Sequence, residues 1–122
     1  MTLTRRRVLA LTATTLASSA VLAQSYPSKP IRLVVNFAAG GTTDVIARAL
    51  AKPLSAILGQ QVVVENKTGA LGAIGAAEVT RAAPDGHTIL FTTQGSVTEI
   101  PVLSPQTPYD PLTALAPVTF IG

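Results

Sequence analysis

A glycine turn bordered by hydroxyl and acid side chains follows the first apolar run of the sequence. The stretch NFAAGGTTD places Gly40 and Gly41 before two threonines, and Asp44 comes directly after them. The apolar spacing that begins here is helical, so the turn would lie at a helix N-terminus, where unpaired amides and about half a positive charge can hold an anion. A plain tight turn with a threonine cap, and with Asp44 as a first-turn acid that favours the helix dipole, remains an alternative.

Other kinds of site lack the residues that they need. Gly69, Gly72 and Gly75 do not match a dinucleotide-binding turn. We interpret them as allowing a small helix to pack closely, with ligand contact as the alternative. His87, the one histidine, follows a turn, which favours a solvent-facing strand start over a general base. Ser96 is not in a nucleophile elbow. With one histidine and no cysteine, the chain is predicted to have no metal site. We also predict no catalytic residue and no cofactor.

The basic charge is concentrated near the start of the chain. The formal net charge is +3, and Arg5, Arg6 and Arg7 account for it, since the other basic residues equal the acidic ones in number. These arginines precede an apolar, threonine-rich stretch, so residues 1–23 are predicted to be an export signal, cleaved after Ala23 by either the Sec or the twin-arginine route. A retained membrane anchor is disfavoured because residues 8–23 are fewer than the roughly 20 that span a bilayer. The neutral remainder disfavours nucleic acid as a partner.

The remaining chain alternates between strand and helix patterns. Hydrophobic residues make up 48% of the sequence and charged residues 12%, which favours a packed domain. The predicted order is strand 31–37, helix 43–58, strand 60–66, helix 73–83 and strand 88–93. This order indicates an α/β fold, a parallel βαβαβ sheet with flanking helices.

Ligands of such sheets bind beyond the carboxyl ends of the strands. The loops expected there, 37–44, 66–73 and 93–98, are rich in Gly, Thr, Gln, Ser and Asn and poor in charge. Backbone amides are therefore the predicted means of binding an anion at this edge.

Four blocks of the sequence resemble a known family. YPSKPIRLVVNFAAGGTTDVIAR, LGQQVVVENKTGALGAIGAAEV, AAPDGHTILFTT and PYDPLTALAPVTFIG are similar, in this order, to the Bug or TctC family, the extracytoplasmic solute receptors of tripartite tricarboxylate transporters. The resemblance covers residues 26–122. It implies a two-lobed periplasmic binding protein of type II-like fold, of which residues 24–122 would be a partial N-terminal lobe, with the second lobe absent and the chain truncated.

The resemblance also implies a function. It indicates a periplasmic receptor, not an enzyme, that captures a small organic carboxylate and delivers it to the membrane subunits of a tripartite tricarboxylate-type transporter, with no stable membrane insertion after signal cleavage. A small stand-alone secreted α/β interaction module without ligand binding is the alternative. The ligand contacts that it implies lie in the loops after the first and third strands. They are Phe37, Ala38, Ala39, Gly40, Gly41, Thr42, Thr43, Asp44, Thr93, Gln94, Gly95 and Ser96.

The sequence departs from the family pattern near these loops. Asn36 and Ala39 stand where the family usually has prolines, and His87 replaces the usual tyrosine. These departures leave the ligand's identity open, and they affect the expected fold less.

Overall fold

The computed structural model describes residues 25–104 and 107–121. The predicted export signal, residues 1–23, lies outside the described residues. Within the described ranges, no helix combines the length and the apolar character needed to cross a membrane.

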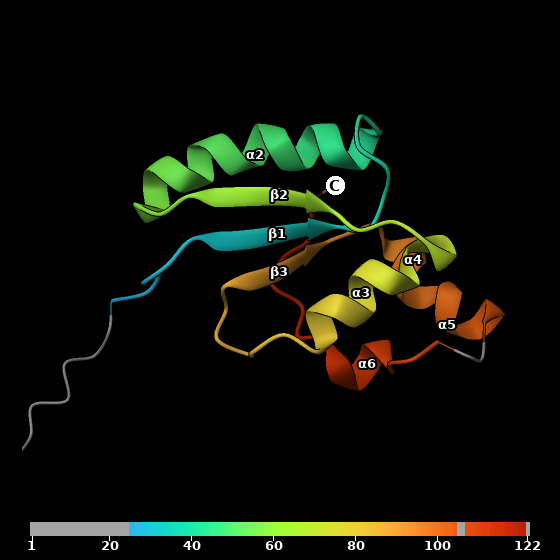
Figure 1. The fold of residues 1–122 in the computed structure, drawn as a ribbon. Helices are drawn as coiled ribbons and strands as arrows, with labels where there is room; N and C mark the ends of the chain where they lie inside the picture. Colours follow the sequence, from blue (N-terminus) through green and yellow to red (C-terminus); the bar gives the residue numbers. More distant parts are fainter. Residues whose placement is uncertain (1–24, 105–106, 122) are drawn as a thin grey trace, which may run out of the picture.

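Strands and helices alternate in the predicted order, followed by short helices (Figure 1). The elements are β1 (Ile31–Val35), α2 (Thr42–Leu58), β2 (Val62–Asn66), the 3-10 turn η1 (Ala70–Gly72), α3 (Ala73–Thr80), β3 (Thr88–Phe91), α4 (Gln94–Thr98), α5 (Ile100–Leu103) and α6 (Pro111–Ala114). Each strand ends within its predicted range, and α2 ends as predicted at Gly59, which takes the left-handed conformation that favours glycine.

The three strands form a parallel sheet in the order β2-β1-β3. Since β1 is first in the sequence but central in the sheet, the chain crosses from one side of β1 to the other after β2. Side chains alternate between the two faces of a strand. Ile31, Leu33 and Val35 pack with Ala47 and Ala51 of α2, forming the main core on that face.

The opposite face of the sheet carries α3. Here Val34 is fully buried, and Ala76 and Ala77 of α3 are also buried. Arg32 of β1 makes two hydrogen bonds to Glu65 of β2 and one to Glu78 of α3, linking both strands to the helix. Helices thus cover both faces of the sheet, as predicted for a parallel α/β sheet with flanking helices.

Candidate functional site

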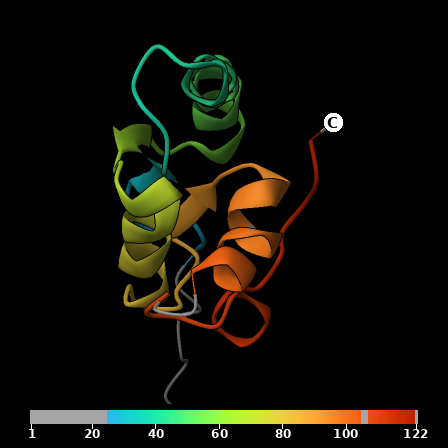
Figure 2. The same cartoon turned by 90° about the vertical axis from the view of Figure 1, so that its right-hand side faces the viewer.

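The carboxyl ends of all three strands lie at one edge of the sheet, the edge that faces the viewer in Figure 2. The loop 37–41 leaves β1 there and arches to the first turn of α2, and a two-residue link joins β3 to α4. In doubly wound sheets the ligand crevice lies where connections from neighbouring strands diverge to opposite sides. The divergence here is between β1 and β3, so these two loops border the expected crevice.

The first turn of α2 presents unpaired backbone amides. Its N-cap is Gly41, which makes no side-chain capping bond, and the first hydrogen bond inside the helix runs from the Val45 amide to the Gly41 carbonyl at 3.0 Å. The Gly41 amide itself donates to Ala38 at 3.2 Å and closes the turn. Among the described residues, the amides of Thr42, Thr43 and Asp44 have no hydrogen-bond partner. These three donors and the positive end of a 17-residue helix form an anion-attracting surface.

The Asp44 carboxylate is directed into the protein. It is 2% exposed, and its Oδ2 accepts bonds from the Gly40 amide at 2.8 Å and from Arg48 Nε at 3.0 Å. Its Oδ1 accepts from Asn66 Nδ2 at 2.9 Å. The Arg48 bond, followed by those from Gly40 and Asn66, lowers the pKa of Asp44 to about 2. The carboxylate therefore stays ionised, and its acceptor positions are used inside the chain.

Two residues of this network were not among the sequence candidates. Arg48 lies one helical turn after Asp44. This four-residue spacing of acid and base could have predicted their ion pair from the sequence. Asn66 ends β2, and its Nδ2 also donates to the Phe37 carbonyl at 3.1 Å. No local pattern indicates that contact, because it joins the end of β2 to the loop after β1.

The predicted loop after the third strand, 93–98, takes a helical form. Thr93 is the N-cap of α4, and Gln94, Gly95 and Ser96 form its first turn. Thr93 and Gln94 are exposed, whereas Ser96 is buried with its Oγ 3.4 Å from Thr93 Oγ1. Phe37 is half-buried against the core, and residues 38–42 are exposed. Both groups of candidates thus present polar, uncharged backbone and hydroxyl groups at the same edge.

The glycines after β2 serve close packing, as predicted. An added Cβ at Gly75 would lie 2.6 Å from the Lys67 carbonyl oxygen and 2.9 Å from Asn36 Cβ. At Gly72 it would meet the Asn36 side-chain amide, which donates to the Gly72 carbonyl at 3.3 Å. These glycines let α3 approach the end of β1.

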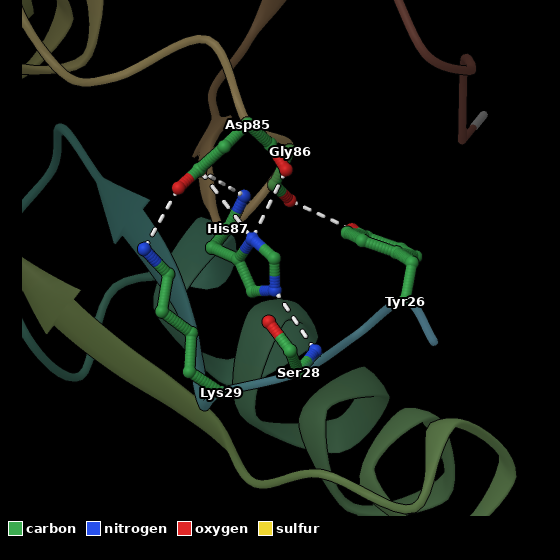
Figure 3. A network of polar contacts seen from close by, with 6 residues as sticks. All are labelled: Tyr26, Ser28, Lys29, Asp85, Gly86 and His87. Atoms are coloured by element: carbon green, nitrogen blue, oxygen red, sulfur yellow. Dashed lines mark hydrogen bonds and ion pairs between the residues drawn. The ribbon is translucent and has the colours of Figure 1, made fainter. Parts of the chain in front are cut away.

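His87 differs from its predicted solvent-facing position. It is only 7% exposed, at the opposite edge of the sheet (Figure 3). The Tyr26 ring packs edge-on against it with the ring centres 4.9 Å apart, and the Ser28 amide donates to His87 Nε2 at 3.3 Å. The prediction was wrong because it considered only the adjacent turn, whereas the N-terminal segment, distant in sequence, covers the ring.

Comparison with known proteins identifies the family. The model of the tripartite tricarboxylate transporter family receptor, TctC, matches residues 46–122. The chain belongs to this receptor family. Protein BugT of Bordetella pertussis is 43% identical to this TctC-family chain over 103 residues, which are 84% of this chain and 32% of BugT. The chain spans about a third of the length of the curated relatives that it matches.

Solved structures of related receptors share the fold. MatC from Rhodopseudomonas palustris, solved with bound malate, is 38% identical with a TM-score of 0.67 over 70% of this chain and 29% of MatC. An R. palustris protein solved with adipate is 42% identical with a TM-score of 0.52 over 53% of this chain and 22% of that protein. The solved structures similar to this chain thus include two proteins with a small dicarboxylate bound.

Proposed function

We propose that this chain forms the carboxylate-binding part of a periplasmic solute receptor, which captures a small organic acid and delivers it to a tripartite tricarboxylate-type membrane transporter. Residues 1–23 would direct export, and residues 24–122 would form part of the first lobe. The proposal draws on the family description and on the relatives solved with malate and adipate.

The observation that carries the proposal is the row of unpaired amides at Thr42, Thr43 and Asp44. A carboxylate placed at the start of α2 would accept hydrogen bonds from these amides and would lie at the positive end of the helix. Because residues 37–43 carry no ionised side chain, the amides would bind the acid without a competing internal anion. The exposed polar groups of Thr93 and Gln94, at the same edge, would contact the rest of the molecule.

One substitution separates the amide from the side chain. Thr42→Pro removes the first helical N–H, and proline is well tolerated at this position of a helix. The preceding Gly41 has φ −74° and ψ 165°, a conformation that a following proline allows. Thr42→Ala is the matched control because it removes only the hydroxyl.

Titration of the chain with adipate and malate, followed by NMR of the backbone amides, tests the proposal. We expect shifts at residues 42–44, and we expect Thr42→Pro to weaken binding by about 1.5–3 kcal/mol, as for a lost hydrogen bond to a charged group. Thr42→Ala should bind nearly as the unchanged chain does. Absence of shifts with both acids, or shifts that a neutral diamide of matching length reproduces, would contradict the proposed carboxylate site.

A further inference from the structure

We infer that Asp44 is a positioning residue for the carboxylate site: its buried carboxylate fixes the loop 37–41, and it does not contact the ligand. This inference rests on the proposed function, and it changes the role that the sequence resemblance implied for Asp44. It depends on the contacts of three side chains, Asp44, Arg48 and Asn66, which we call the loop clamp.

The carboxylate has no free face to offer a ligand. Three donors from different parts of the chain, the Gly40 amide, Arg48 Nε and Asn66 Nδ2, bind its two oxygens at 2.8 to 3.0 Å. The side chain is 3% exposed. A ligand group could reach these oxygens only by displacing an internal partner.

The loop is held at both of its ends by the clamp. Asn66 Nδ2 donates to the Phe37 carbonyl where the loop leaves β1, and Asp44 binds the Gly40 amide just before the helix. Arg48 Nη2 in turn donates to Asn66 Oδ1 at 3.0 Å, which orients the Asn66 amide group. Gly40 has φ +80°, so the bonded turn uses a conformation that glycine adopts without strain.

The clamp also keeps Asp44 away from the amides of its own helix. An acid in the first turn commonly bonds back to the amide of the N-cap residue, which here would be Gly41. Asp44 instead bonds one residue earlier, to Gly40, and Arg48 balances its charge. The amides of residues 42–44 are unpaired, and the Asp44 carboxylate beside them is already bonded to other donors.

Asp44→Asn distinguishes a positioning role from a purely electrostatic one, because the two roles predict opposite changes in affinity for the acids. All three partners of the carboxylate are donors, so an asparagine amide must turn its NH₂ toward at least one of them and release part of the clamp. We expect weaker binding of adipate and malate by about tenfold or more, as misplacement of binding groups produces. If Asp44 contributed only its charge, removal of that charge near an anion site would strengthen binding by a few fold.

The two acids separate positioning from direct contact. Malate has a hydroxyl that could donate to Asp44, whereas adipate has none. If Asp44 positions the loop, Asp44→Asn should reduce the affinity for both acids to a similar degree. A reduced affinity for malate alone, or tighter binding of both acids, would overturn the inference. Asn66→Ala keeps the charge of Asp44 but removes the hydrogen bond to the Phe37 carbonyl, so it should also weaken the binding of both acids. Lys52→Gln on the exposed surface of α2 is the control for a charge change on this helix.

Hydrogen exchange of the Gly40 amide tests the loop clamp without any acid. In the unchanged chain this amide should be protected, and Asp44→Asn should reduce its protection about tenfold while the middle of α2 stays protected. Unchanged protection in the variant would overturn the inference even if the acids bind. If neither acid binds the unchanged chain, the proposed function fails, and the Gly40 measurement still decides whether Asp44 holds the loop.

Discussion

Asp85 is the residue that fastens the N-terminal segment to the turn before β3. Its Oδ2 accepts from Lys29 Nζ at 2.7 Å, and its Oδ1 accepts from the His87 amide at 3.0 Å. The Lys29 bond, followed by the His87 amide, lowers the pKa of Asp85 from 3.8 to about 2. Because the folded state then binds fewer protons than the unfolded state, the stabilisation is present above about pH 4 and is lost as the pH falls towards 2.

We therefore expect Asp85→Asn to lower stability near neutral pH and to lose less stability on acidification. Urea midpoints measured from about pH 6 down to about pH 2 test this. In Asp85→Asn the dependence of the urea midpoint on pH should become only partly weaker, since Asp44 also has a lowered pKa. In Lys29→Met, NMR titration should show the pKa of Asp85 rising towards 3.8, because its principal partner is gone. An acid response of Asp85→Asn equal to that of the unchanged chain would refute this role.

Gly75 allows α3 to pack closely against the segments that follow β1 and β2. Gly75 lies inside α3, where alanine would favour the helix by about 0.5–1 kcal/mol. The added Cβ, however, would lie 2.6 Å from the Lys67 carbonyl oxygen, and a backbone atom moves only with its strand connection. We expect Gly75→Ala to lower the free energy of unfolding by about 1–3 kcal/mol, measured by urea denaturation.

Gly95→Ala in α4 is the matched control for helix propensity. The nearest atom to its added Cβ is the Glu99 carboxylate at 3.3 Å, the end of a flexible side chain that can move. This variant should be at least as stable as the unchanged chain. If Gly75→Ala is stabilised to the same degree, α3 does not pack as closely as described.

Local patterns were sufficient to predict the main elements. The β-branched run of β1 and the three- and four-residue spacing of α2 are properties of adjacent residues, so the strands, helices and parallel order could be read from the sequence. The helices α4, α5 and α6 were missed, because four or five residues are too few to show a helical period and prolines interrupt the region.

Contacts between distant segments could not be predicted. The burial of His87 depends on Tyr26, and the loop clamp depends on Asn66. No pattern in the neighbouring sequence indicates either contact. For the candidate site, the glycine turn and the exposed amides could be inferred from the helix start. The internal use of the Asp44 carboxylate could not, since it requires the end of β2 to lie beside the loop.

At the scale of the whole molecule, the C-terminal part leaves large apolar side chains uncovered. Val102, Leu103, Leu112, Val118 and Phe120 are each between 73% and 88% exposed, and they lie in one continuous part of the chain. The sheet also ends in two edge strands, β2 and β3, within the described residues. Exposed apolar side chains and unpaired strand edges both favour association.

We expect the 122-residue chain to associate with rising concentration and to bind a hydrophobic dye such as ANS. Light scattering coupled to gel filtration, together with dye fluorescence, measures both effects. Val118→Ser combined with Phe120→Ser should reduce association and dye binding without lowering the melting temperature, because side chains 79% exposed contribute little to the core. Ile57→Ser is the control, since Ile57 is also 79% exposed but lies apart on α2. If the chain stays a monomer that binds no dye at every concentration, the C-terminal part covers these side chains in solution. If Ile57→Ser reduces association to the same degree, association does not depend on the C-terminal surface.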